Sequence, residues 1–339
     1  MENKVIIIAE AGVNHNGDLD KAKQLIDAAA AAGADYVKFQ TFVADNLVSK
    51  VAEKADYQTV NTGNNDSQYE MLKKLELSHE DHLLLQNYCH EKQIKFFSTA
   101  FDHDSIDFLK SLELGLWKVP SGEITNLPYL EHIGHFNEDV ILSTGMSTLE
   151  EVMDAVHILV EAGTEKEKIT VLHCTSNYPT AMNEVNLRSM IYMKDKLGVK
   201  VGYSDHTLGI EVAIAAVAMG ACVIEKHFTL DRNFLGPDHK ASLQPGELID
   251  MVKSIRNIED ALGKYSKEPA ESEMVTRNVA RKSIHLKNNL SVNHILTFED
   301  LNFIRPGDGI SPTFYKKVIG KSINQNFTSG HKLKWNDIN

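Results

Sequence analysis

Residues 5–40 read VIIIAEAGVNHNGDLDKAKQLIDAAAAAGADYVKFQ, and they contain one complete strand–helix–strand unit. The β-branched apolar run at residues 5–9 has the length of a buried strand. Asp18 can cap the segment that follows, in which apolar residues recur at helical spacing, and Gly33 is a typical residue for ending that helix. Residues 36–40 read as the next strand. The stretch therefore predicts two strands joined by a helix.

The same unit recurs along the chain. Further strands are expected at residues 95–98, 116–119, 140–142, 169–173, 200–203 and 222–225, with helical runs such as 150–163 and 211–219 between them. Eight alternating units predict an α/β protein whose parallel sheet closes into a (β/α)₈ TIM barrel. No Gly-x-Gly-x-x-Gly turn follows a strand, which disfavours an open doubly wound sheet. The long polar loop from Gln40 to about Ser78 is expected to cover an active site.

The pattern changes after about residue 264. We expect a TIM-barrel catalytic domain over residues 1–264, a linker over 265–281 and a small β-rich domain over 282–339. The small domain has little apolar content, so it should be marginally stable alone and should dock onto another surface. We find no sequence repeat beyond the βα units.

Composition excludes several classes of function. The net charge of −12 argues against nucleic-acid and anionic-membrane partners, which need a basic face. Three scattered cysteines without a Cys-x-x-Cys pair indicate a reducing compartment. The apolar run at residues 5–9 is too short for a signal peptide or a membrane span, so we expect a cytoplasmic protein. An anionic substrate would need local positive groups to overcome the overall charge.

Polar residues stand at all eight predicted strand ends, where the chemistry of a TIM barrel is expected. They include Glu10, Lys38, Gln40, Thr99, Lys118, Ser121, Glu123, Ser143, Ser204, His206, Glu225 and His227. Loops are polar in any case, and chance could supply two or three such positions. Polar residues at every strand end favour a functional site.

His206 and His227 follow adjacent strands, so their side chains could converge on one metal ion. Neutral imidazoles favour Mn²⁺, Fe²⁺, Co²⁺ or Zn²⁺ over Mg²⁺. Two protein ligands would leave coordination positions for water or substrate, as Lewis-acid catalysis requires. The ordinary alternative is that each histidine only caps a loop.

Lys38 and Lys118 are the lysines at the ends of the second and fourth strands. With neighbouring serine and threonine hydroxyls they could form a cradle for phosphate or carboxylate. A lysine that forms a Schiff base, as in aldolases, and a solvated surface lysine are the alternatives. Glu10 and Glu123 could serve as general acids or bases, or pair with these lysines.

Together these segments resemble the sialic acid synthase family. The resemblance rests on residues 10–17, 37–41, 118–123, 142–146, 204–207 and 225–229 of the barrel. Arg305-Pro306-Gly307 is similar to the family's C-terminal antifreeze-like (SAF, β-clip) domain. The motifs occur in order over nearly the whole chain, which makes the resemblance specific.

The resemblance implies a reaction of phosphoenolpyruvate with N-acetylmannosamine and water. The C–O bond of phosphoenolpyruvate breaks, and phosphate and a nine-carbon nonulosonic acid form. A metal, Mn²⁺ or another divalent ion such as Mg²⁺ or Co²⁺, activates the sugar aldehyde.

The resemblance also assigns roles to residues of this chain. His206 and His227 would bind the metal. Phosphoenolpyruvate would be held by Lys38, Thr99, Lys118, Ser121, Ser143, Ser176 and Ser204. Catalysis would involve Glu10, Glu123, Lys118 and Arg305, with Glu123 activating the water and Glu10 positioning metal-bound water or sugar hydroxyls. The sugar would contact Gln40, Tyr178, Asp238 and Arg305.

The small domain of relatives crosses to the partner subunit, where an arginine equivalent to Arg305 reaches the N-acyl group. This implies a domain-swapped homodimer. Many relatives carry Thr-Asn-x-Tyr-Pro after the sixth strand, whereas this chain has Thr175-Ser176-Asn177-Tyr178-Pro179. The role of the family asparagine falls to Ser176 or Asn177.

Two alternatives remain open. Within the family, a legionaminic acid synthase would use 2,4-diacetamido-2,4,6-trideoxymannose, and the loops at residues 57–68 and 176–182 would decide between the sugars. A pseudaminic acid synthase is disfavoured by residues 237–242, which look more like the sialic and legionaminic branches. Outside the family, a Schiff-base aldolase would use Lys38 or Lys118 covalently.

Overall fold

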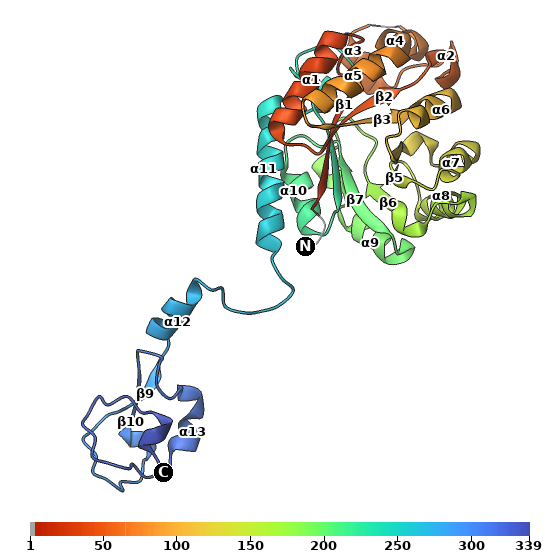
Figure 1. The fold of residues 1–339 in the computed structure, drawn as a ribbon. Coiled ribbons are helices and arrows are strands. Elements are labelled where there is room, and N and C mark those ends of the chain that lie inside the picture. Colours follow the sequence, from red (N-terminus) through yellow and green to blue (C-terminus); the bar gives the residue numbers. More distant parts are fainter. Residues whose placement is uncertain (1–3, 65) are drawn as a thin grey trace. The chain divides into compact units, whose positions relative to one another are not determined.

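The computed structural model describes residues 4–64 and 66–339, so the first three residues of the predicted barrel domain lie outside it. The chain forms two compact units, one ending at Gly263 and the other running from Lys264 to Asn339 (Figure 1). Each unit has its own hydrophobic core.

The first unit is an eight-stranded parallel barrel. Its strands are β1 (Ile6–Gly12), β2 (Tyr36–Thr41), β3 (Lys95–Ala100), β4 (Leu116–Val119), β5 (Asp139–Ser143), β6 (Ile169–His173), β7 (Lys200–Asp205) and β8 (Val223–His227). They are hydrogen-bonded in the order β3-β2-β1-β8-β7-β6-β5-β4, and β3 also contacts β4. The predicted TIM barrel is confirmed.

Helices surround the barrel (Figure 1). They are α1 (Leu19–Ala32), α5 (His79–Glu91), α6 (His103–Ser111), α7 (Leu127–Gly134), α8 (Leu149–Ala162), α9 (Arg188–Leu197), α10 (Glu211–Ala218) and α11 (Pro245–Leu262). The side chain of Asp18 accepts hydrogen bonds from two backbone N–H groups at the start of α1. Gly33 ends that helix with a left-handed φ of 77°. Both predicted caps of this helix are confirmed.

The segment between β2 and α5 is more regular than the loop we predicted. It contains the short helices α2 (Ala44–Leu47), α3 (Asp56–Thr62) and α4 (Gln68–Leu75). Ser67 and Glu70 cap each other's backbone N–H groups at the start of α4. Met71 and Leu75 are buried on one face of that helix. This insertion therefore has a folded apolar side.

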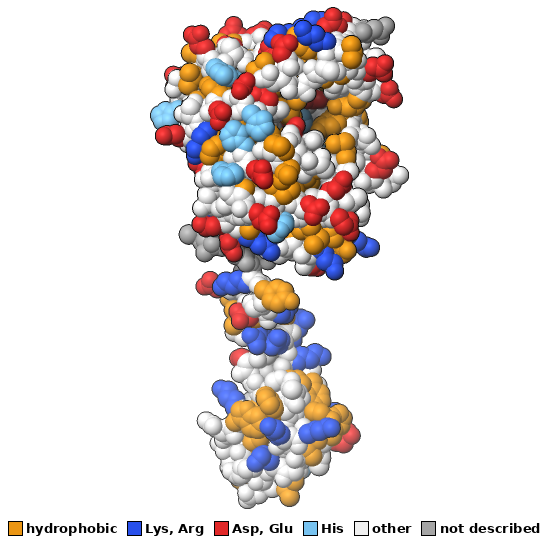
Figure 2. Space-filling model, turned by 90° about the vertical axis from the view of Figure 1, so that its right-hand side faces the viewer, with side chains coloured by type: hydrophobic (Ala, Val, Ile, Leu, Met, Phe, Trp, Pro, Cys, Tyr) orange, Lys and Arg blue, Asp and Glu red, His pale blue; other side chains and the backbone are white. Residues whose placement is uncertain are grey.

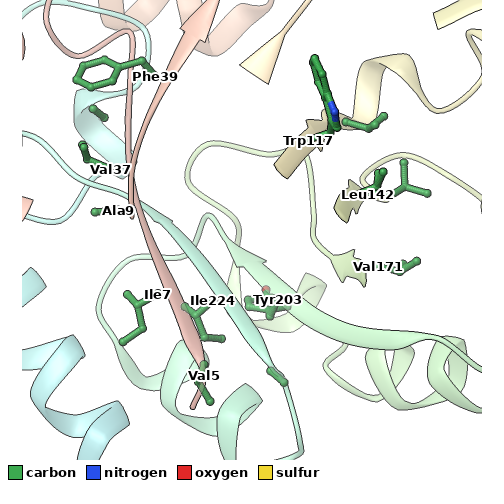
Figure 3. Packing of buried hydrophobic residues seen from close by; sticks show 14 of the residues in the cluster. Val5, Ile7, Ala9, Val37, Phe39, Trp117, Leu142, Val171, Tyr203 and Ile224 are labelled. Atoms are coloured by element: carbon green, nitrogen blue, oxygen red, sulfur yellow. The ribbon is translucent and has the colours of Figure 1, made fainter. Parts of the chain in front are cut away.

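Side chains of the strands alternate between two environments because the side-chain period of a strand is two. Outward residues such as Ile7, Ala9 and Ile224 belong to the main core of strands and helices (Figure 3). An apolar layer of Ile8, Phe97, Ile141, Leu172 and Val223 forms a separate cluster. Residues two positions further along those strands are Glu10, Thr99, Ser143, Cys174 and Glu225. The alternation thus sets a polar layer above the apolar one.

The second unit has its own core. It contains α12 (Glu273–Ala280), the antiparallel strands β9 (Ser283–Leu286) and β10 (Leu301–Ile304), and α13 (Tyr315–Val318). Its core consists of Ile284, Leu286, Leu290, Leu296, Leu301, Ile310, Val318, Ile323, Phe327 and Leu333. Helix α12 lies within the segment that we expected to be a linker.

The second unit is also built from two similar halves, residues 283–302 and 320–339. Leu290 and Phe327 occupy equivalent positions and exchange two backbone hydrogen bonds of 2.9 and 3.0 Å. In both halves a histidine Nε2 lies 3.0 Å from the Oδ2 of the aspartate six residues later, in the pairs His294–Asp300 and His331–Asp337. Sequence analysis did not identify this repeat.

Charge is divided unequally between the units. Residues 264–339 hold 12 of the 35 Lys and Arg residues but only 7 of the 47 Asp and Glu residues, so the barrel unit carries the negative charge. Figure 2 shows acidic side chains spread over the barrel face and basic ones on the small unit. Among the described residues, none of the helices combines the length and hydrophobicity needed to cross a bilayer.

Candidate active site

A cavity of about 550 Å³ opens at the carboxyl ends of the strands. Of the predicted site residues, it is lined by Glu10, Lys38, Gln40, Thr99, Lys118, Ser121, Glu123, Ser143, Ser176, Tyr178, Ser204, His206, His227 and Asp238. Arg305 lies exposed in the second unit, after β10. The structure therefore brings together every predicted barrel residue in one cavity.

Lys38 is buried at the cavity floor between two carboxylates. Its Nζ lies 2.9 Å from Glu10 Oε2 and 3.6 Å from Glu225 Oε2. The ammonium also donates a 2.9 Å hydrogen bond to Thr99 Oγ1. Burial opposes the charged form, but the two carboxylates outweigh it and raise the pKa of Lys38. This lysine remains a cation in the folded protein.

Lys118 occupies the neighbouring part of the floor. Its Nζ donates hydrogen bonds of 2.7 Å to Ser143 Oγ and 3.1 Å to the Val119 carbonyl oxygen. Glu225 Oε1 lies 4.0 Å from the same nitrogen. Burial lowers the pKa of Lys118, although Glu225 partly offsets that effect. The ammonium group of Lys118 and the hydroxyl group of Ser143 therefore lie side by side, and both could donate hydrogen bonds to a bound anion.

Glu225 joins the two lysines, and sequence analysis did not assign it a role. It accepts a 3.1 Å hydrogen bond from Ser204 Oγ. Burial favours its neutral form, but Lys118 and Lys38 outweigh this and hold the pKa of Glu225 below its usual value. The signal was present in the sequence, since Glu225 and His227 are two residues apart on one strand and must share a face.

Two acids of the cavity have pKa values close to neutrality. Burial raises the pKa of Glu10 to about 7, against the opposing effect of Lys38. Burial likewise raises the pKa of Asp238 to about 6. A carboxyl group that titrates near neutral pH can take up or release a proton during a reaction.

His206 and His227 present neutral imidazoles to the cavity. His206 Nδ1 donates a 2.6 Å hydrogen bond to the Thr175 carbonyl oxygen, which leaves Nε2 unprotonated, with Ser204 Oγ 3.5 Å away. His227 Nδ1 is buried without a hydrogen-bond partner among the described residues. Burial lowers the pKa of both histidines, and their ring centroids are 5.5 Å apart.

These histidines fit a divalent metal, because an unprotonated ring nitrogen is the ligand that such ions require. Within residues 4–64 and 66–339, no three or more His, Cys, Asp or Glu side chains form a ready-made metal site. A metal held by the pair would therefore keep positions open for water or substrate.

Gly145 lies in a hydroxyl-rich corner of the cavity. Its backbone N–H donates a 2.8 Å hydrogen bond to Ser121 Oγ. A Cβ at this position would lie 2.1 Å from Ser176 Oγ and 3.2 Å from Cys174 Sγ, so a larger residue would push these two side chains away. Ser176 lines the cavity, whereas Asn177 Nδ2 donates to Glu184 Oε2 at 3.3 Å. Of the two residues to which the resemblance assigns the role of the family asparagine, Ser176 is the one that lines this cavity.

Aromatic rings form part of the cavity wall. Tyr178 packs on His206 with ring centroids 4.1 Å apart, and Tyr57 of α3 stacks on Tyr178 at 5.4 Å. Tyr57 was not among the predicted site residues, since the sequence only placed it in a variable loop. Glu123 also lines the cavity and accepts a 2.6 Å hydrogen bond from Asn126 Nδ2.

One wall of the cavity is hydrophobic. We call it the apolar wall, and it consists of Val13, Phe42, Leu47, Met71, Leu72, Leu75 and Phe101. These residues pack together as a cluster separate from the main core, and each of them lines the cavity. They come from the loops after β1, β2 and β3 and from helices α2 and α4 of the insertion.

Comparisons with known proteins agree with this geometry. The NeuB family model matches residues 25–267, and the SAF domain model matches residues 281–339. The chain is 49% identical to the N,N'-diacetyllegionaminic acid synthases of Campylobacter jejuni, with 98% of this chain and 99% of the relative covered, and of Legionella pneumophila, with 98% and 94% covered.

A solved structure shares the fold. The N-acetylneuraminic acid (sialic acid) synthetase of Leptospira borgpetersenii, crystallised with citrate, superposes with a TM-score of 0.70. It is 36% identical, and the match covers 81% of this chain and 90% of that chain. The barrel, its cavity and these matches together show that the chain belongs to the NeuB family and carries a SAF domain.

Proposed function

We propose that this protein is a nonulosonic acid synthase. It joins phosphoenolpyruvate to an N-acylated amino sugar and consumes water, giving a nine-carbon sugar acid and phosphate. The observation that carries this proposal is that two buried lysines and two neutral histidines line one cavity. The 49% identity to synthases of this class over nearly the full chain supports it.

The lysine floor suits phosphoenolpyruvate, which carries a phosphate and a carboxylate. Lys38 with Thr99 and Lys118 with Ser143 provide two separate groups of cation and hydroxyl. Charge-assisted hydrogen bonds to anions are the strongest kind in proteins. Further hydroxyl donors to the same substrate are Ser121, Ser176 and Ser204.

The bound sugar needs an electrophilic aldehyde. A divalent ion such as Mn²⁺, or Mg²⁺ or Co²⁺ in its place, held by His206 and His227 would polarise the aldehyde oxygen. Gln40, Tyr178 and Asp238 line the same cavity and offer hydrogen bonds to the sugar. Glu10, with its raised pKa, holds water or a sugar hydroxyl in place.

Bond formation joins the methylene carbon of phosphoenolpyruvate to the aldehyde carbon, and the aldehyde oxygen takes up a proton to become a hydroxyl group. Water then adds to the former enol carbon, and Glu123 accepts one proton of that water. The C–O bond to phosphate breaks as the hydroxyl left by the water loses its proton and becomes the carbonyl oxygen of the product. Phosphate leaves with the bridging oxygen.

Two sugars are candidates. N-acetylmannosamine would give a sialic acid, and 2,4-diacetamido-2,4,6-trideoxymannose would give a legionaminic acid. The floor of the cavity serves both, because both react through an aldehyde. The 49% identity to legionaminic acid synthases, against 36% to the solved sialic acid synthetase, favours the second sugar.

Phosphate release from phosphoenolpyruvate tests the proposal. With Mn²⁺ present, release should require one of the two sugars and should stop when a chelator is added. A Schiff-base aldolase would instead remain active with chelator and would be trapped by borohydride with a keto acid. Release that is absent with both sugars would contradict the proposed reaction.

A second test addresses the metal. The variant His206→Ala should stay folded while losing bound manganese, measured by elemental analysis, and nearly all activity. Full activity in that variant would contradict the metal assignment. The domain-swapped homodimer, the role of Arg305 in it and the cytoplasmic location remain predictions from the sequence.

A further inference from the structure

The segment Asn14-His15-Asn16 follows β1, and the chemistry described above gives it no role. Asn14 is only 1% exposed. A second loop follows β8, and we call its residues 235–242 the Asp238 loop. Asp238 lines the cavity, and its Oδ2 lies 3.9 Å from His227 Nδ1. Because β1 and β8 are neighbours in the barrel, the two loops leave it side by side.

The side-chain amide of Asn14 is bonded to the β8 side of this pair. Its Nδ2 donates a 2.8 Å hydrogen bond to the Phe228 carbonyl oxygen and a 2.9 Å bond to Ser242 Oγ. The fully buried Ser242 hydroxyl in turn donates a 2.7 Å bond to the Asp238 carbonyl oxygen. A carbonyl oxygen can only accept, so the direction of these bonds is fixed. Asn14 thus anchors the backbone of Asp238 to the residue that follows His227.

Asn16 holds the beginning of the same loop. Its Nδ2 donates a 3.0 Å hydrogen bond to the Leu235 carbonyl oxygen, and its Oδ1 lies 3.3 Å from His239 Nε2. A Cβ at Gly236 would lie only 2.8 Å from that Oδ1, so the two loops approach more closely there than a side chain would allow. The Asp238 loop is therefore held on both sides of Asp238.

Resting on the proposed function, in which Asp238 contacts the sugar, we propose that Asn14 is a positioning residue for Asp238. Acting through Ser242, it fixes the backbone from which the Asp238 carboxylate reaches the cavity. Substrate contacts tolerate little displacement, and an error of about 1 Å can cost about 100-fold in rate. Loss of this link should therefore lower kcat/KM for the sugar roughly 10- to 100-fold.

Ser242→Ala tests the link with the least disturbance. It removes the hydroxyl between Asn14 and Asp238 and leaves the bond from Asn14 to Phe228 in place. We expect kcat/KM for the sugar to fall by the factor above. The KM for phosphoenolpyruvate should keep its wild-type value, because the lysine floor is held from other strand ends. Asn14→Ala should show the same split between the two substrates.

Thr164→Val is the matched control. The Thr164 hydroxyl is also buried and donates a 3.2 Å hydrogen bond to a backbone carbonyl oxygen, that of Gly134, but it lies between α8 and β6, at the amino end of the strand. Its loss should leave the constants for both substrates unchanged. Wild-type kcat/KM for the sugar in folded Ser242→Ala, or an equal loss for both substrates, would overturn the proposal.

A double-mutant cycle separates positioning from general stabilisation. If Asn14 and Ser242 act through the Asp238 carboxylate, adding Ser242→Ala to Asp238→Ala should cause no further loss of kcat/KM for the sugar. Independent effects would multiply instead, and multiplied losses would contradict the proposed link.

Hydrogen–deuterium exchange of the Asp238 loop gives a readout that does not depend on the reaction. Exchange should be faster in Asn14→Ala, or in Ser242→Ala if the first variant does not fold, and unchanged in Thr164→Val. Failure of the proposed function would look different, since the wild type would then release no phosphate with either sugar. Exchange alone would then decide, and a wild-type rate in both loop variants would overturn the positioning role.

Discussion

Replacing Lys118 by methionine separates the lysine's role in binding from its role in stability. Methionine fills a similar volume but removes the cation and its hydrogen bond to Ser143 Oγ. A charge-assisted hydrogen bond to a substrate anion contributes about 1.5–3 kcal/mol. Since 1.4 kcal/mol is a tenfold change, the KM for phosphoenolpyruvate should rise roughly 10- to 150-fold.

The stability of this variant should fall only moderately. After the loss of Lys118, Glu225 still has the cation of Lys38 at 3.6 Å. Glu10, with a pKa of about 7, can also take up a proton, which would offset the loss of the positive charge of Lys118. Because one of the two lysines that hold Glu225 ionised remains, the free energy of unfolding should fall by less than the roughly 3–5 kcal/mol that is typical when a buried charge loses its partner.

Lys226 provides the matched comparison. It is fully buried on the adjoining β8, but its Nζ pairs with Asp205 Oδ2 at 2.8 Å and it does not line the cavity. Lys226→Met leaves Asp205 as an unpaired buried charge, which should lower the free energy of unfolding by about 3–5 kcal/mol. Phosphoenolpyruvate titrations and thermal unfolding of both variants measure the contrast. An unchanged KM in folded Lys118→Met would refute the lysine floor as the anion site.

Three further predictions follow from other parts of the molecule. Gly145→Ala should lose most activity because its Cβ would lie 2.1 Å from Ser176 Oγ, and adding Ser176→Gly should restore part of it in the phosphate-release assay. Burial lowers the pKa of His15 from 6.5 to about 4, so the contribution of neutral His15 to stability is full above pH 6.5 and is lost as the pH falls to 4. Between these two pH values the free energy of unfolding of the wild type should fall by about 3 kcal/mol more than that of His15→Gln. Equal pH dependence of the two free energies would count against this prediction. Mixing Arg305→Ala with His206→Ala should restore activity through hybrid dimers, and no recovery despite confirmed subunit exchange would argue against a shared site.

The sequence predicted the barrel well because each strand is a short apolar run followed by a turn. Strands β4 (Leu116–Val119) and β6 (Ile169–His173) have the predicted bounds, and the remaining strands differ only at their ends. Charged residues extended several of them, as in β8, which ends at His227 beyond the predicted residue 225. Hydrophobicity marks the buried part of a strand but not the polar residues that continue it.

The site residues were predicted from their places at strand ends, and this approach missed residues whose role depends on their contacts in the folded protein. Glu225 was read as one of several polar residues, since sequence alone does not show that it lies between two lysines. The helices of the insertion were missed although Ser67 and Glu70 form a recognisable capping box. Tyr57 and the apolar wall depend on how that insertion folds back over the cavity.

The small unit shows a different limit. Its two halves share few identical residues, so pattern reading found no repeat. Their likeness lies in equivalent contacts, such as the His294–Asp300 and His331–Asp337 pairs. The unit also has its own core, which its low apolar content did not lead us to expect.

The central claim is that the cavity breaks the C–O bond of phosphoenolpyruvate while joining it to a sugar. Phosphoenolpyruvate labelled with ¹⁸O at the bridging oxygen tests this directly, with the released phosphate analysed by mass spectrometry. The account predicts that the phosphate carries the label and that release requires the sugar. Unlabelled phosphate would mean that the P–O bond breaks instead, and it would contradict the proposed reaction.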